Sequence, residues 1–244
     1  MNRILRTLIP LTAAAALVVG GVAAPAIAAP EPNLTVAKAE VTKRIDLRLA
    51  ALKKFDTALN AAKHITDGHR STLHTLVTED ISGLTALKTK VAGETTREAL
   101  RADAKSMVDD YRVFILVGPK VRLTAVSDAE VAAVAKLKAA HDKLADLVAK
   151  AKAAGKDTAA AEQDLAAMQA ATDKASAGID GDVATLLAIE PGPDGDAIRA
   201  KVGECRTSLK TARADLKTAV TAAKKVRAFL KSLKPSPAPA ASPS

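Results

Sequence analysis

The sequence predicts an all-α protein: an elongated antiparallel bundle or coiled coil of about six helices. Apolar residues recur at spacings of three and four through most of the chain, which places them on one face of a helix. Alanine dominates the apolar fraction, whereas the 244 residues include one Tyr, three Phe and no Trp. Because alanine favours helix but buries little surface, slim, closely packed helices are expected rather than a sheet.

Residues 1–28 are interpreted as a secretory signal peptide. Arg3 and Arg6 precede an uncharged apolar stretch, and the small residues before Ala29 match a cleavage pattern, with the cut between Ala28 and Ala29. A retained N-terminal membrane anchor is the alternative. No later apolar run approaches the ~18 residues that a membrane span needs. We therefore expect a secreted protein without a membrane span in its mature form.

Helix-breaking residues divide the chain that follows. After a short N-terminal segment, residues 29–34, the first three helices are expected within residues 35–117 and the last three within residues 118–234. These helices form either one elongated domain or two tandem three-helix bundles. The final residues, 235–244, are rich in Pro, Ala and Ser and are expected to be disordered.

The first helix is expected over residues 35–66 and ends at Asp67-Gly68. The second covers about residues 69–91. The third begins at a capping box, in which the Thr95 hydroxyl and the Glu98 carboxylate bond the first free amides.

Gly118-Pro119 interrupts the third helix, because proline lacks an amide hydrogen and crowds the preceding turn. The interruption is either a kink between two nearly continuous helices or a full stop. The fourth helix then runs to about residue 154, the fifth covers about residues 157–189, and the sixth covers residues 197–233.

The sixth helix has the most regular pattern in the chain. Its apolar positions alternate in steps of four and three over five heptads, which is typical of a coiled-coil seam. These positions are Ile198, Val202, Cys205, Leu209, Ala212, Leu216, Ala219, Ala223, Val226, Leu230 and Leu233.

Charge is distributed unevenly along the chain, whose net charge is +9. A basic stripe runs beside the seam of the sixth helix, whereas the region from Asp157 to Asp196 contains nine acidic residues and one lysine. We favour an antiparallel hairpin in which these opposite charges match. The alternative is contact with a polyanion. The stripe consists of Arg199, Arg206, Lys210, Arg213, Lys217, Lys224, Arg227 and Lys231.

A second candidate region is apolar on every side and therefore should be covered on every side. We interpret it as the centre of the fold, where the two groups of helices meet. A buried site for an apolar small molecule is the functional alternative. The residues are Tyr111, Val113, Phe114, Ile115, Leu116 and Val117.

No catalytic, cofactor-binding or metal-binding constellation is recognised, so we expect no enzyme activity and no cofactor. A metal site formed by His64, Asp67 and His69 is a minor alternative to solvated or capping roles. Asp109 and Asp110 point about 100° apart on a helix and are poor partners for acid–base chemistry. Cys205 is expected to fill the seam, with an intermolecular disulfide as the alternative.

Two segments carry a resemblance. "KRIDLRLAALKKF" (43–55) and "DYRVFILVGPKVRL" (110–123) resemble a family of exported, Ala-rich helical proteins of GC-rich Gram-positive bacteria. The similarity spans most of the mature chain. The family has no established activity, so the resemblance implies only export and a helical architecture, and no functional residues carry over.

Together these observations predict a secreted structural or interaction protein of the cell envelope or extracellular space. Its partner would be an anionic cell-wall polymer, contacted by the basic last helix, or another protein; a carrier of an apolar molecule at residues 111–117 is the alternative. Nucleic acid is not expected, because stacking on bases requires aromatic residues among the basic ones, and Phe229 is alone there.

Overall fold

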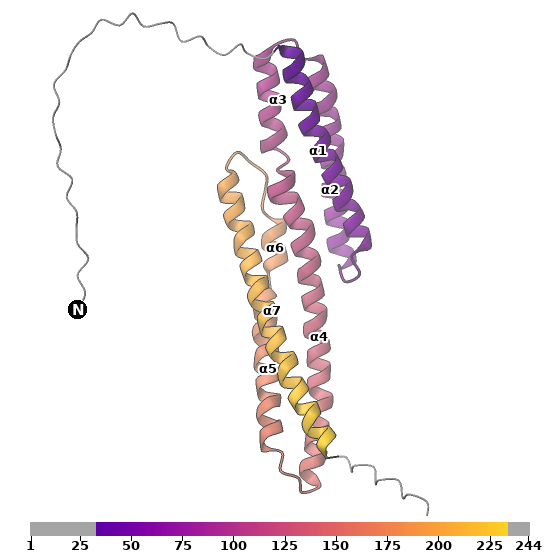
Figure 1. Ribbon diagram of the computed structural model, residues 1–244, viewed down its shortest axis with the longest axis vertical. Helices are drawn as coiled ribbons and strands as arrows, with labels where there is room; N and C mark the ends of the chain where they lie inside the picture. Colours follow the sequence, from indigo (N-terminus) through magenta and orange to yellow (C-terminus); the bar gives the residue numbers. More distant parts are fainter. Residues whose placement is uncertain (1–32, 234–244) are drawn as a thin grey trace, which may run out of the picture. The chain divides into compact units, whose positions relative to one another are not determined.

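A computed structural model describes residues 33–233, and this part of the chain contains helices and no strand (Figure 1). The all-α prediction is therefore confirmed. The proposed signal peptide (1–28) and the Pro/Ala/Ser tail (235–244) lie outside the described residues. Within them there are seven α-helices and one π-helical turn, rather than six helices: α1 (Leu34–Ala61), α2 (Asp67–Gly93), α3 (Arg97–Asp109), η1 (Val113–Val117), α4 (Gly118–Ala153), α5 (Ala159–Ile179), α6 (Asp182–Leu187) and α7 (Gly195–Ser232).

The turn between α1 and α2 begins earlier than predicted. The guanidinium of Arg70 donates hydrogen bonds to the carbonyls of Leu59 and Ala62 at the end of α1. The Thr66 side chain accepts from the amide of His69 and caps the start of α2. The side chain of Arg70 in α2 thus bonds the last carbonyls of α1. A contact of this kind cannot be read from the helical periodicity of the sequence.

The third and fourth helices are interrupted at Arg112, not at Gly118-Pro119 as predicted. Arg112 has φ 44°, a left-handed backbone conformation that is uncommon for a residue with a side chain. From Val113 onward the backbone is helical through η1 into α4. Pro119 lies in the first turn of α4, directly after the π-helical turn, and does not stop the helical run. The start of α3 also differs, because Thr96, not Thr95, is its N-cap.

The predicted fifth helix is two helices. Gly181 adopts φ 75° between α5 and α6, a conformation that glycine reaches at little cost. The side chain of Asp194 then caps α7 by accepting from the amides of Asp196 and Ala197. The sequence shows the glycine at position 181, but its periodicity does not show that a helix of only six residues follows.

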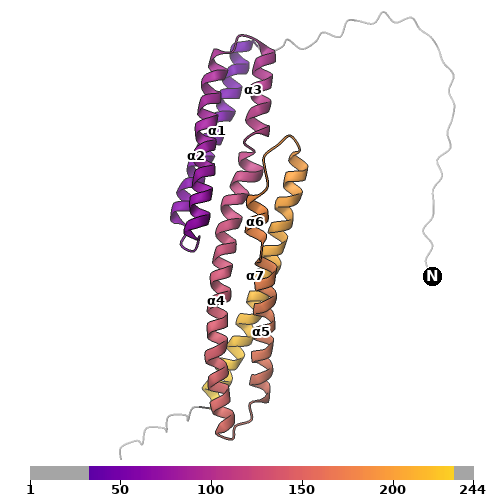
Figure 2. The ribbon, with the colours of Figure 1, turned by 180° about the vertical axis from the view of Figure 1, so that it is seen from behind.

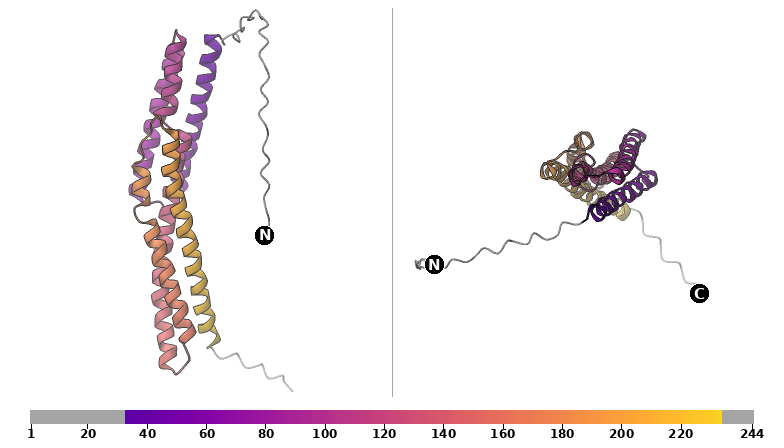
Figure 3. Two further views of the ribbon diagram at one scale, coloured as in Figure 1. Left: turned by 90° about the vertical axis from the view of Figure 1, so that its left-hand side faces the viewer. Right: turned by 90° about the horizontal axis from the view of Figure 1, so that it is seen from above.

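The helices form two packed groups that share the α3–η1–α4 rod (Figures 1 and 2). α1 and α2 pack on each other and on α3, whereas α4, α5 and α7 pack together. Figure 3 shows α7 (yellow) beside α5 over much of its length, and this is the most extensive helix pair. The first core includes Val121 of α4. The two groups therefore do not divide cleanly at residues 117 and 118.

The predicted seam of α7 is confirmed over most of its length. Its positions from Ile198 to Val226 are buried, and Leu230 and Leu233 are half-buried. Small residues let α5 and α7 approach closely: Ala175 and Ala212 are fully buried and belong to one core cluster. Burial of many small side chains, rather than a few large ones, holds this pair together.

We predict that Gly118→Ala destabilises the protein by about 1–2 kcal/mol, because an added Cβ would lie 2.8 Å from Cζ of Phe55 and the ring must move. Gly203→Ala is the matched control. Gly203 lies inside α7 with open space around it, so alanine there should stabilise by about 0.5–1 kcal/mol. Urea unfolding of both variants measures the difference. Equal effects of the two substitutions would contradict the contact with Phe55.

Candidate functional site

All eight residues of the predicted basic stripe lie on the exposed side of α7. Two of them have acidic neighbours. Arg199 lies 2.6 Å from Asp196 in the first turn of α7, and Arg213 lies 3.0 Å from the buried carboxylate of Glu130 on α4. Within residues 33–233 the other six form no ion pair: Arg206, Lys210, Lys217, Lys224, Arg227 and Lys231.

The favoured explanation of the stripe, charge matching with α5, is wrong for these residues. α5 and α7 do pack against each other, but in the described part of the chain only Lys225 and Asp164, 3.4 Å apart, form an ion pair between them. Lys225 is not part of the stripe. Within the stripe, Arg213 pairs instead with Glu130 of α4. Lys217 lines one pocket together with Asp164 of α5, but the ion pair of Asp164 is with Lys225.

A groove runs between α4 and α7. Its volume is about 560 Å³. Its floor is aliphatic, with Val220 40% exposed, and its rim carries four cations and no carboxylate. The lining residues are Ala133, Lys136, Leu137 and Ala140 of α4, and Arg213, Leu216, Lys217, Val220 and Arg227 of α7.

Glu130, the acidic partner of the groove residue Arg213, is already engaged. Burial raises the pKa of Glu130, and the Arg213 guanidinium opposes part of that rise. One Glu130 oxygen accepts from Nε of Arg213, which leaves the remaining groove cations uncompensated. A surface that combines unpaired cations with an apolar floor is suited to bind an anionic partner with apolar portions.

The apolar block joins the two cores but is not covered on every side. Val113 and Val117 are buried among α1 and α2, and Leu116 is buried with residues of α6 and α7. Ile115 packs partly against that second group. Phe114 corrects the prediction, because it is 51% exposed.

Contacts with α1 and α2 position Phe114 and Tyr111 of this segment. The guanidinium of Arg48 on α1 lies 5.4 Å from the ring centre of Phe114, a cation–π contact that stabilises an exposed ring. Tyr111 packs closely on Gly83 of α2, where a Cβ would be 2.5 Å from its hydroxyl. The segment thus acts mainly as the contact between helix groups.

The other sequence candidates take structural roles. Asp109 contacts Lys105 and Arg112, and Asp110 contacts Ser106. Cys205 is buried, burial raises the pKa of its thiol, and Sγ lies 3.9 Å from the Asp182 carbonyl oxygen. A buried thiol cannot reach a second chain, so the intermolecular disulfide is not supported.

The proposed His64–Asp67–His69 metal ligands are not brought together as a site. Among the described residues no group of three His, Cys, Asp or Glu side chains is placed to hold a metal ion. His69 instead contacts Asp128 on α4, a residue 59 positions away.

A buried charged group that the sequence did not indicate lies where α2, α4 and α6 meet. Asp80 is 9% exposed and one of its carboxylate oxygens has no hydrogen-bond partner. Burial raises the pKa of Asp80 from 3.8 to about 7, with a further contribution from Glu79 and an opposing one from Lys120. Lys120 is also buried and donates to the Leu187 carbonyl at 2.9 Å. Burial lowers its pKa.

Periodicity could not identify this group, because both residues are of types that normally face solvent. Tyr111 belongs to the same surroundings: burial raises its pKa, and the charges of Asp110 and Asp80 raise it further. Glu190, in the loop before α7, acts on Lys120 in the direction that keeps it protonated.

Comparison with protein-family models, with curated proteins and with solved structures finds no match. None of the helices within residues 33–233 combines the length and hydropathy of a membrane span. The candidate site therefore rests on its own geometry.

Asp80→Asn should change how stability depends on pH. Between about pH 4 and pH 7 the folded state holds a proton on Asp80 that the unfolded state has lost, so the wild-type free energy of unfolding falls as pH rises through this window. The variant should lose that slope. At pH 8 its free energy of unfolding should exceed that of the wild type by roughly 1–3 kcal/mol, which is the cost of burying a group whose hydrogen bonds are incomplete.

Urea unfolding at several pH values measures this effect. Asp46→Asn is the control, because Asp46 is exposed and paired with Lys88 at 2.6 Å. An unchanged slope in Asp80→Asn would show that Asp80 is ionised in the folded protein at pH 6.

Proposed function

We propose that the protein is a secreted helical interaction protein that binds an anionic polymer of the cell envelope along the α4–α7 groove. The observation that carries the proposal is the row of α7 cations that form no ion pair within the described chain. Two of them, Lys217 and Arg227, line the groove beside the exposed Val220 and half-buried aliphatic side chains of α4. Such cations raise the local concentration of anions and release bound counterions on contact.

The spacing of the cations supports a repeating partner. Successive members of the stripe are three, four or seven residues apart, so along the helix axis a charge follows at intervals of about 5 to 10 Å. A chain with regularly repeated negative groups can contact several cations at once, and each exposed contact need contribute only a few tenths of a kcal/mol.

The chemistry of the groove disfavours nucleic acid. Single strands bind through aromatic residues on which bases stack. Phe229 is the aromatic residue of α7, and it packs against the core that contains Leu144 and Val148. The aliphatic floor instead fits a polymer whose repeat includes saturated carbon, such as a polyol phosphate.

We predict that Lys217→Glu combined with Arg227→Glu weakens binding of a soluble polyol phosphate by at least about tenfold at 50 mM salt. Loss of two cationic contacts should also lower the slope of log K against log salt by about 1.5. Fluorescence anisotropy of a labelled polymer at several salt concentrations measures both quantities.

The matched control is Lys53→Glu combined with Lys54→Glu. These residues are exposed on α1, and their reversal changes the net charge by the same amount. If the control weakens binding as much as the groove variant, attraction is due to net charge alone and the groove has no role. Wild-type binding that does not change with salt would also contradict the proposal.

A further inference from the structure

A second cleft lies on a different side of α4 from the proposed polymer groove. Its volume is about 700 Å³, and it opens where α5 ends and Gly181 turns the chain into α6. α4 forms one wall, the α5–α6 junction forms the other, and His69 from the start of α2 closes one end. Parts of the chain that are far apart in sequence therefore meet around one hollow.

The polar end of this cleft contains an oriented imidazole. The carboxylate of Asp128, 6% exposed, accepts from the Thr66 amide at 2.8 Å and from Nδ1 of His69 at 2.9 Å. These bonds fix the ring and place the proton of the neutral imidazole on Nδ1. Nε2 is then left as a hydrogen-bond acceptor.

Ser127 adds a second group at this end. Its side chain lines the cleft, is 1% exposed, and its hydroxyl has no hydrogen-bond partner. A buried hydroxyl without a partner costs roughly 1–3 kcal/mol, so a native protein usually satisfies it. The bonds of Asp128 and His69 do not involve this hydroxyl.

The walls beyond these groups are aliphatic. Val134 and Ile179 are buried at the base, and Val131 is 53% exposed beside them. Val183 contributes from α6. An exposed valine over a hollow of this size provides apolar surface that a ligand of small-molecule dimensions would cover.

The charge of the lining selects among such ligands. Asp128, Asp173 and Asp180 contribute carboxylates, whereas Lys138 is the lysine of the lining and lies 3.8 Å from Asp173. Acidic groups therefore exceed basic ones, and at the polar end both Nε2 of the neutral His69 ring and the Ser127 hydroxyl can accept a hydrogen bond. A ligand that donates hydrogen bonds and carries positive charge satisfies both conditions.

We propose that the α4–α5–α6 cleft binds a small hydrophobic amine, with its ammonium group at His69 and Ser127 and its hydrocarbon portion along Val131 and Val183. This inference is independent of the polymer groove, because the two sites share no lining residue. It also places a small-molecule site away from residues 111–117.

Octylammonium, octan-1-ol and octanoate test the proposal, because they share one chain length and differ in the head group. The chain has four histidines, so the ring protons of His69 can be assigned by NMR with His69→Gln. Octylammonium should shift the His69 resonances saturably and bind at least about tenfold more tightly than octanoate, with octanol between them. Equal shifts by all three probes, or no saturable shift with octylammonium, would overturn the proposal.

His74 provides an internal control. Its Nδ1 lies 2.7 Å from Asp56 on an exposed surface, so it reproduces the His–Asp pair without a cleft. The His74 resonances should stay unchanged during the titration. Parallel shifts of the His74 resonances would show that the amine associates with acidic surfaces in general, and would contradict specific binding in the cleft.

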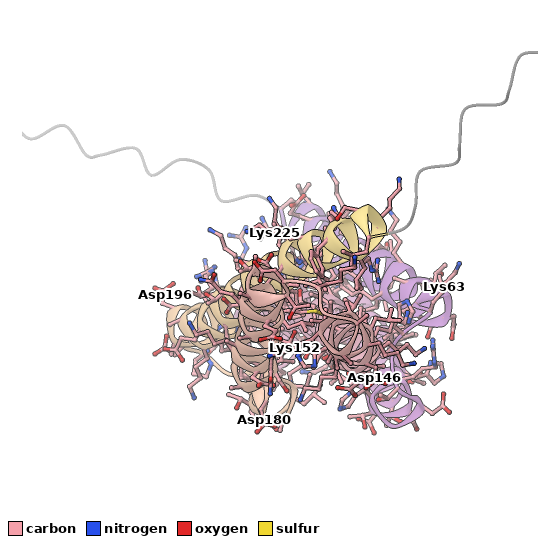
Figure 4. All side chains as sticks on the ribbon, turned by 90° about the horizontal axis from the view of Figure 1, so that it is seen from below. Lys63, Asp146, Lys152, Asp180, Asp196 and Lys225 are labelled. Atoms are coloured by element: carbon pink, nitrogen blue, oxygen red, sulfur yellow. The ribbon has the colours of Figure 1, made fainter. Side chains whose placement is uncertain are left out.

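Two variants locate the site. Ala177→Trp should fill the cleft and abolish binding, and because Ala177 is an exposed residue of α5 the fold should be retained. Asp180→Asn should weaken octylammonium by roughly threefold, as expected for one exposed charge. Asp146→Asn on α4 is the control and should have no effect; Figure 4 labels both aspartates. Undiminished binding in a folded Ala177→Trp protein would contradict this location.

Discussion

The fold depends on the apolar side chains of residues 113–121, apart from the exposed Phe114, being buried by two groups of helices at once. Val113, Val117 and Val121 belong to the core of α1 and α2, and Leu116 belongs to the core of α6 and α7. A segment of large apolar side chains in an otherwise alanine-rich protein supplies the area that slim helices lack. Without this shared segment, each group would lose part of its core.

Arg112 fixes the direction in which this segment enters. Its left-handed backbone ends the preceding helix, while its guanidinium, largely buried, donates to the carbonyls of Gly192 and Pro193 at 2.6 Å each. These bonds tie the loop before α7 to the α3–η1 junction. A strained backbone conformation persists where surrounding contacts determine it, as they do here.

The same helix packing determines which side chains remain free to bind a partner or ligand. α7 turns its seam toward α4 and α5, so the basic stripe borders α4, where Glu130 is the acidic partner and engages Arg213. The break at Gly181 separates α6 from the line of α5 and leaves the second cleft beside α4. The α4–α7 groove thus follows from the face that α7 turns toward α4, and the second cleft follows from the turn between α5 and α6 at Gly181.

The sequence by itself determined the helical class, the α7 seam and the basic stripe, because each depends on local periodicity along one helix. Tertiary structure alone decided that Phe114 is exposed, that Asp80 and Lys120 are buried, and that His69 meets Asp128. These outcomes depend on which helix faces which, and a helical pattern specifies a face but not its neighbour. The break at Arg112 was missed for the same reason, since distant carbonyls of the 192–193 loop hold it.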